Sequence, residues 1–227
     1  SWVPKRIIRL LIACSSLVPV SHMYMSLDFK IKRFLSGLLV EKDMRDQAWL
    51  GSFNEEERTK LFKKEDVTEP ILRHINTIKD FWSRLQSQYF NLYLVDNILV
   101  KADRASMAHG LEVRSPFLDL HIVEFAHALQ FNQKLNITNR KAIIKKMMRG
   151  KIPDEVIDRP KKGFGVPLGQ WFSGALKPWV QEVLSPDNTK HIGLFNQAYI
   201  DTMLNEHWSN KVENRKKIWT LVVLYVW

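Results

Sequence analysis

The sequence predicts a mainly α fold, on three observations. Apolar residues recur at intervals of three, four and seven over much of the chain, which is the spacing of a helix face. An alternating strand pattern is almost absent from the 227 residues. Residues that begin and end helices, such as Asn54, Asp119 and Gly150, stand at the borders of these apolar segments.

Two helices are predicted near the start of the chain. Pro4 can occupy the first turn of a helix that continues through the apolar run before Cys14. The same run could be a signal peptide ending at this cysteine, but it is short and Arg9 interrupts it, so an internal amphipathic helix is favoured. The second helix spans Ser26–Leu39, with an apolar face made of Leu27, Ile31, Phe34, Leu35 and Leu38.

The next helices are separated by a polar segment. Asn54 can cap a helix whose first turn carries three glutamates, which favour the positive end of the helix dipole. The polar segment Lys63–Pro70 is expected to be a loop. A long, largely buried helix is then predicted from Ile71 to Lys101, with Val95-Asp96-Asn97 as a candidate interruption.

Charged and apolar residues are closely interleaved in the stretch Lys101–Asp119. We expect these charges to be partly buried, and a buried charge costs several kcal/mol unless it is paired or hydrogen-bonded. Two interpretations remain open at this point: structural ion pairs that fix how helices cross, or a functional site.

Helices also follow this stretch. Asp119 can cap Leu120–Leu129, and Thr138 or Asn139 can cap the basic helix Arg140–Arg149. A short helical turn is expected at Ile152–Ile157. Four more helices are predicted near the end of the chain: Leu168–Phe172, Ala175–Leu184, Gln197–Trp208 and Asn214–Trp227.

The segment Arg159–Pro167 is predicted to be a loop, because it contains two glycines and two prolines. Its glycines would let backbone amides approach a phosphate, while Arg159, Lys161 and Lys162 supply positive charge. The alternative is an exposed basic turn. Because Lys134 to Gly165 holds ten basic and three acidic residues, it carries +7 of the net charge of +10, which suggests a polyanionic partner.

Composition excludes several classes of protein. A single cysteine allows neither an internal disulfide nor a cysteine metal cluster, and it suits a cytoplasmic location. No apolar run approaches the length of a membrane span. The seven histidines show no pair at ligand spacing, so no metal site is predicted, and His109 is expected to be a packing or capping residue rather than a base. For nucleic acid, Arg140–Arg149 is the one candidate surface, and binding is not favoured.

Several ordered blocks of residues resemble a known family. The run from Tyr93 to Met107 is followed by L-E-V-R-S-P-F-L-D at Leu111–Asp119, and later by R-P-K-K-G-F at Arg159–Phe164. In this order and spacing they are similar to the C-terminal synthetase domain of glutamine-hydrolysing asparagine synthetase. Weaker similarity includes Arg33-Phe34-Leu35 and the final helix, so the resemblance spans most of the chain.

The resemblance implies a fold and a chemistry. The expected fold is the helical C-terminal portion of an α/β synthetase domain like those of the PP-loop ATP pyrophosphatases, with residues 1–227 forming one domain. In such an enzyme, aspartate and MgATP form a β-aspartyl-adenylate. Ammonia from glutamine reaches this intermediate through a tunnel, and asparagine and AMP leave.

The resemblance also assigns residues. Lys161 matches the catalytic lysine, which would neutralise charge on the α-phosphate and the leaving pyrophosphate, with Lys162 as the alternative. Six residues are expected to frame the substrate and ATP site. They are the family matches Asp103, Arg104, Glu112 and Arg114, together with Arg159 and Lys162 from the basic loop. Val113 and Ser115 match a stretch that lines the tunnel.

The sequence also departs from the family pattern. The Ser-Gly-Gly-x-Asp-Ser pyrophosphate loop and the Ser-Asp-Glu block are absent from it. We therefore expect an inactive fragment that binds no cofactor alone, whose partner is the N-terminal half with the glutaminase and ATP-binding regions. A homodimer remains open. The alternatives are a related amidotransferase acting on a sugar, a peptide or a β-lactam precursor, or a basic helical binding module.

Overall fold

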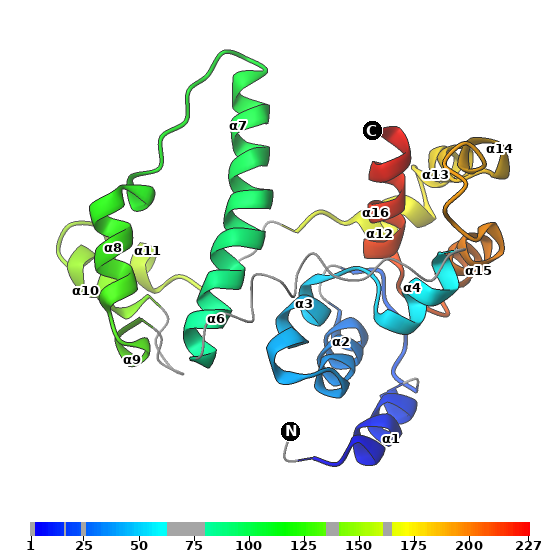
Figure 1. The fold of residues 1–227 in the computed structure, drawn as a ribbon, viewed down its shortest axis with the longest axis horizontal. Helices are drawn as coiled ribbons and strands as arrows, with labels where there is room; N and C mark the ends of the chain where they lie inside the picture. The colour runs from blue at the N-terminus through cyan, green and yellow to red at the C-terminus, as the bar shows by residue number, and fades with distance from the viewer. Residues whose placement is uncertain (1–2, 16, 24–25, 63–79, 135–140, 161–164) are drawn as a thin grey trace. The chain divides into compact units, whose positions relative to one another are not determined.

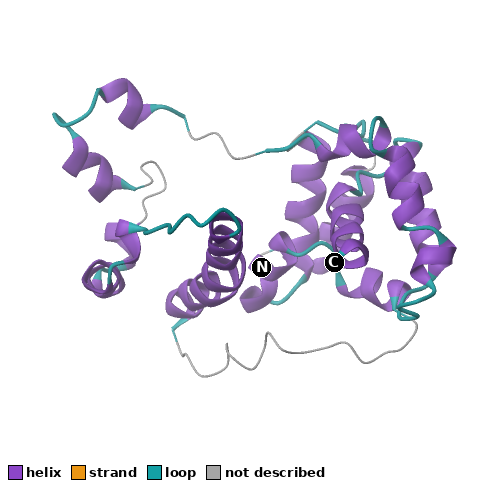
Figure 2. Cartoon of the chain, turned by 90° about the horizontal axis from the view of Figure 1, so that it is seen from above, coloured by secondary structure: helices purple, strands orange, loops and turns teal. Residues whose placement is uncertain are grey.

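The computed structural model describes residues 3–15, 17–23, 26–62, 80–134, 141–160 and 165–227. Within these ranges the chain is helical and forms no strand, and an isolated antiparallel bridge joins Phe62 to Phe195 (Figures 1 and 2). The predicted mainly α class is therefore confirmed. In the described ranges, no helix is both long and apolar enough to cross a membrane.

The chain divides into two compact units. Unit 1 comprises residues 1–70 and 164–227, and unit 2 comprises residues 71–163. A single domain over residues 1–227 stays a prediction. The helices of unit 1 are α1 (Lys5–Ser15), α2 (Leu27–Leu39), η1 (Lys42–Met44), α3 (Arg45–Leu50), α4 (Glu55–Leu61), α12 (Leu168–Ser173), α13 (Lys177–Val183), α14 (Pro186–Thr189), α15 (Gln197–Trp208) and α16 (Arg215–Val226).

The core of unit 1 joins α4 to the last helices of the chain. Trp208 Nε1 on α15 donates to the carbonyl oxygen of Phe172 at 3.0 Å, which ties α15 to α12. The backbone amide of Asn196 donates to Leu61 at 2.7 Å and so attaches the start of α15 to the end of α4. The buried cluster is Leu61, Phe172, Val180, Leu184, Phe195, Ile200, Met203, Leu204, Ile218, Leu221 and Val222.

The predicted cap of α4 is confirmed in detail. The Asn54 side chain accepts from the backbone amide of Glu57 at 2.8 Å, and the Glu57 carboxylate accepts from the amide of Asn54 at 2.9 Å. This reciprocal pair satisfies two amides that have no partner inside the helix.

The predicted apolar face of α2 is wrong in part. Leu27 and Phe34 are exposed, whereas Asp28 and Gly37 are buried. Gly37 is buried because Trp49 of α3 packs onto it: a Cβ at position 37 would lie 1.8 Å from the Trp49 Nε1. The close approach of α3 therefore determines which side of α2 faces inward, and this does not follow from the apolar periodicity.

Unit 2 is built around one long helix. Figure 1 draws α6 (Phe81–Gln88), η2 (Tyr89–Leu99) and α7 (Val100–Met107) as a continuous rod. The middle part, η2, has the wider winding of a π-helix. The helix therefore does not break at 95–97, and the long predicted helix is confirmed over the described residues from Phe81 onward. Its predicted burial is wrong: between Phe81 and Met107, Gln88 is the one buried residue in the described structure, and apolar side chains such as Tyr93 and Val100 are exposed.

Shorter helices complete unit 2. They are η3 (Pro116–Leu118), α8 (Leu120–Ala128), α9 (Phe131–Lys134), α10 (Ala142–Met148) and α11 (Asp154–Asp158). Lys134 Nζ donates to Gln86 Oε1 on α6 at 3.2 Å, and the rings of Phe90 and His127 meet edge to face. The basic helix begins at Ala142 rather than Arg140, and Lys141 before it has φ +60°. Its predicted caps, Thr138 and Asn139, lie outside the described residues.

Candidate functional site

The stretch Lys101–Asp119 forms a helix end, a turn and an extended segment. After α7, Gly110 adopts φ +67°, a left-handed conformation that glycine tolerates best. The amide of Leu111 donates back to Ser106 at 3.0 Å, which closes the turn. At the far end, the Asp119 carboxylate accepts from the amide of His121 at 3.0 Å and caps α8, as predicted.

The charges of this stretch are exposed, which contradicts the expectation that they are partly buried. Asp103, Arg104, Glu112 and Arg114 are all in the exposed class. The structure brings Glu112 and Arg114 together as an ion pair, although their side chains are 67% and 86% exposed. Water therefore solvates these charges, and their presence among apolar neighbours does not require burial. Exposed pairs of this kind contribute little to stability.

Large apolar side chains in and beside the same stretch are exposed too. Met107, Leu111, Val113, Phe117 and Leu120 each expose between 54% and 66% of their area. Exposed apolar surface therefore accompanies the exposed charges of this stretch. Val113 and Ser115 are the two residues assigned to the tunnel wall, and both are exposed on the extended segment.

Arg159 follows an ion-pair network at the end of α11. Arg149 contacts Asp154 at 2.8 Å and Asp158 at 2.7 Å, and Lys145 lies 3.5 Å from Asp158. Hydrogen bonds to the two carboxylates raise the pKa of Arg149, and the bond from Arg149 lowers the pKa of Asp158. The network attaches α10 to α11 and so positions the chain just before Arg159, which is exposed. Lys161 and Lys162 lie outside the described residues.

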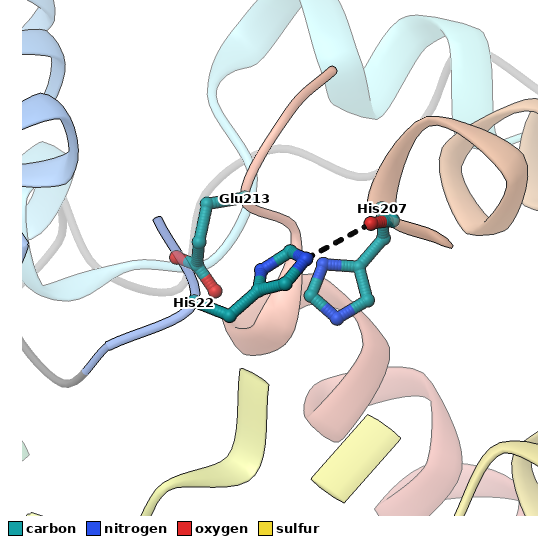
Figure 3. Close-up of side chains that lie close together, drawn as sticks. All are labelled: His22, His207 and Glu213. Carbon is teal, nitrogen blue, oxygen red and sulfur yellow. Dashed lines mark hydrogen bonds between the residues drawn. The ribbon is translucent and has the colours of Figure 1, made fainter. Parts of the chain in front are cut away.

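Unit 1 contains a side-chain cluster that the sequence does not predict. His22, His207 and Glu213 meet between the α1–α2 connection and the end of α15 (Figure 3). The two histidines are 185 positions apart, so no local spacing marks them. Their proximity could be found only from the fold.

Comparisons with known proteins address the chain as a whole. The family model described as "Asparagine synthase" matches residues 10–227. The glutamine-hydrolyzing asparagine synthetase 1 of Bacillus subtilis is 28% identical over 162 residues, which are 71% of this chain and 25% of that protein. A putative glutamine-hydrolyzing asparagine synthetase of Mycobacterium bovis is 31% identical over 163 residues, covering 71% of this chain and 24% of that protein.

A relative that matches a shorter stretch carries a different name. The protein named "Amidase chry2" of Gibberella zeae is 29% identical over 108 residues, which are 44% of this chain and 16% of that protein. The matches to the first two relatives thus span about a quarter of their length. No solved structure gives a significant match to this chain.

Proposed function

Because the chain belongs to the asparagine synthase family, we propose that it forms part of an ATP-dependent amidotransferase that makes asparagine from aspartate. The ammonia is derived from glutamine, and the intermediate is β-aspartyl-AMP. The observation that carries the proposal is the family match over residues 10–227, which includes every block that resembles the synthetase domain. The glutamine-hydrolyzing names of the two bacterial relatives support the choice of ammonia donor.

The described residues do not by themselves fit MgATP. An ATP site surrounds the phosphates with backbone amides and cations. Here Arg114 is paired with Glu112, Arg149 is paired with Asp154 and Asp158, and Arg159 is exposed. No described group of residues closes around a phosphate, so we derive no catalytic step through ATP, and we expect the chain alone to be inactive.

Within the proposal, the basic loop that begins at Arg159 and the stretch Lys101–Asp119 have different roles. Lys161, or else Lys162, is the proposed catalytic residue, and its positive charge would face the phosphates of ATP in the complete enzyme. Asp103, Arg104, Glu112 and Arg114 frame the substrate side, and Val113 and Ser115 contribute to the ammonia path. The exposed apolar side chains beside these residues are consistent with such a frame, which would be covered by the ATP-binding and glutaminase regions.

A pyrophosphate assay tests the expected inactivity. The chain is incubated with ATP, Mg²⁺, aspartate and ammonia, and pyrophosphate is measured against a Lys161→Ala control. We expect no difference, because positioning of ATP supplies much of the catalytic effect and one lysine loop cannot provide it. Pyrophosphate release by the unmodified chain above the control would contradict this part of the proposal.

A chimera tests the function itself. The matching quarter of the Bacillus subtilis relative is replaced by this chain, and folding is checked by gel filtration and circular dichroism. We expect asparagine formation that is lost on Lys161→Ala and retained on Lys151→Ala, a basic exposed residue outside the predicted site. A folded chimera that releases no pyrophosphate with aspartate would refute the proposed function.

A different acceptor is the second candidate. The amidase relative in Gibberella zeae favours it, since that protein matches 44% of this chain under a different name. Assaying the same chimera with a panel of carboxylates separates the two candidates. Pyrophosphate release with another carboxylate in place of aspartate would favour the related amidotransferase.

A further inference from the structure

We propose that His22, His207 and Glu213 bind a divalent transition-metal cation of the zinc type in unit 1. Figure 3 shows the ring of His22 between the carboxylate of Glu213 and the ring of His207. One nitrogen of each imidazole and one oxygen of the carboxylate all lie within 4.8 Å of one another. Imidazole and carboxylate together are a ligand set that zinc and its neighbours accept.

The end of α15 places two of the three ligands. His207 lies in its last turn, and Asn210 after it has φ +56°, which reverses the chain. The amides of Lys211 and Val212 both donate to the carbonyl oxygen of Glu206, at 2.9 and 3.2 Å. This turn brings Glu213 back to His207 before α16 begins.

The connection between α1 and α2 supplies the third ligand. His22 Nε2 donates to the carbonyl oxygen of His207 at 3.1 Å, and the two rings are 4.3 Å apart between centroids. With its proton on Nε2, His22 has Nδ1 available, and this buried atom has no hydrogen-bond partner among the described residues. A metal-binding histidine usually donates its second nitrogen to a backbone carbonyl or a carboxylate in this manner.

The three ligand atoms must move closer together to bind one cation. Zinc bonds to nitrogen and oxygen of about 2.0 Å in a tetrahedron place ligand atoms about 3.3 Å apart. The three ligand atoms therefore need to approach by up to about 1.5 Å, which side-chain rotation of His22 and Glu213 can supply. Gly169 keeps the site narrow, because a Cβ there would lie 2.9 Å from the His22 carbonyl oxygen and 3.4 Å from Glu213 Oε1.

The hydrogen bonds of His207 show which nitrogen can bind a cation. Its Nδ1 accepts from the backbone amide of Asn214 at 3.3 Å. Its buried Nε2 has no hydrogen-bond partner among the described residues. Binding through Nδ1 therefore replaces the long bond from Asn214, while Nε2 carries the proton.

The balance of buried charges around the three residues favours a cation. Glu213 is only 3% exposed at its side chain, and Arg215 lies 3.6 Å from its Oε2. A second carboxylate, Asp28, is 1% exposed, and neither of its oxygens has a hydrogen-bond partner in the described structure. Its ion pair with Lys32 is long, at 4.0 Å. Lys32, Arg215 and Lys217 all act on these two buried carboxylates. Neither oxygen of Asp28, nor Oε2 of Glu213, has a hydrogen-bond partner among the described residues, so a divalent cation can still reduce the cost of burying them.

A bound cation would link segments that are far apart in sequence. It would attach the α1–α2 connection to the turn between α15 and α16, across the 185 positions from His22 to His207. Such a link stabilises the folded state by mass action, so stability should rise with cation concentration.

The test uses the full 227-residue chain with Co²⁺ and Zn²⁺ as probes. The single exposed cysteine is first changed by Cys14→Ser, so that its thiol does not bind metal. After treatment with a chelator, Co²⁺ binding is followed by visible absorption and Zn²⁺ binding by the melting temperature. We expect saturable one-to-one binding and a melting temperature that rises with free Zn²⁺.

Variants locate the site. His22→Gln and Glu213→Gln should each weaken Co²⁺ binding by at least about tenfold, since even changes to residues behind the ligands have effects of that size. His121→Gln, which removes an exposed histidine of unit 2, should leave the affinity unchanged. Circular dichroism in chelator confirms that each variant is folded, and His207→Gln is omitted because its side chain is fully buried. No binding by the parent chain, or equal binding by both ligand variants and the parent, would overturn the proposal.

Discussion

Units 1 and 2 differ in how their apolar side chains are used. Of the thirteen buried hydrophobic residues among those the structure describes, Ile157 alone lies in unit 2. Both units expose large apolar side chains, for example Leu27 and Phe34 in unit 1 and Met107, Val113 and Phe125 in unit 2, so the difference lies in the buried ones. Unit 1 encloses a core that runs from α4 to α16.

The residues that stabilise the fold and the blocks that resemble the synthetase domain lie in different units. The blocks that resemble the synthetase domain, from Tyr93 to Asp119 and around Arg159, lie in unit 2. The residues that stabilise the fold by burial lie mainly in unit 1. Substitutions should therefore affect stability in unit 1 far more than in unit 2, whereas effects on the activity of the chimera should show the opposite order.

The largest effect is expected at the core of unit 1. Phe172 is fully buried and stacks on Trp219, so Phe172→Ala should reduce the free energy of unfolding by about 3–5 kcal/mol. The matched change in unit 2, Phe125→Ala, removes a side chain that is 60% exposed and should change it by less than about 0.5 kcal/mol. Hydrogen exchange of α12–α16 and of α8 measures both. Equal losses at the two positions would remove the contrast between the units.

Two glycines extend the comparison to the backbone. Gly37→Ala places a methyl group 1.8 Å from the Trp49 ring, so α3 must move, at a cost of about 1–3 kcal/mol. Gly110→Ala meets no atom within 4 Å and is opposed only by its φ of +67°, at about 1 kcal/mol. Urea denaturation compares the two variants. A larger loss at Gly110 would show that the turn in unit 2 is more constrained than the helix contact in unit 1.

The stability of unit 1 should depend on pH through His207. In metal-free chain the pKa of His207 is about 4 when folded and about 6.5 when unfolded, so the unfolded state binds more protons between these values. The contribution of the neutral His207 ring to the free energy of unfolding is complete above pH 6.5. It is lost as the pH falls towards 4, with a slope of at most about 1.4 kcal/mol per pH unit.

Glu213 should partly mask this dependence. Burial raises its pKa, so its contribution runs in the opposite direction, being present at low pH and lost as the pH rises through the folded pKa. Urea denaturation is carried out at several pH values in chelator. The free energy of unfolding should fall more steeply with decreasing pH for Glu213→Gln than for the parent chain. An unchanged or flatter profile would contradict the assignment to His207.

The smallest effect is expected for the ion pairs of unit 2. Arg149→Met removes the contacts to Asp154 and Asp158, which are exposed, so the loss should be slight and should nearly vanish at about 1 M salt. Hydrogen exchange of α10 and α11 at low and high salt measures it. A loss that persists at high salt would mean that packing of the arginine stem, rather than its charge, attaches α10 to α11.

The local features of the fold were predictable from neighbouring residues. The caps at Asn54 and Asp119 were predicted at the correct positions, because a cap involves groups two or three residues apart. The resemblance to the synthetase domain was likewise carried by contiguous blocks, and the family match over residues 10–227 confirms it. The roles of Lys161 and the residues around it remain predictions.

Burial was predicted less well. The charges at Asp103, Arg104, Glu112 and Arg114 were expected to be partly buried and are exposed, and Asp28 is buried where Leu27 was expected. Composition within a segment does not say which other segment will cover it. For α2 that segment is α3, whose Trp49 packs on Gly37.

The sequence by itself determined that this chain is helical, where most of its helices lie and which family it belongs to, since these depend on residues close together along the chain. The tertiary structure decided which faces are buried and which distant side chains meet. His22, His207 and Glu213 come together only because the turn after α15 and the α1–α2 connection converge. Long-range contacts depend on how the whole chain packs, and no spacing in the sequence encodes them.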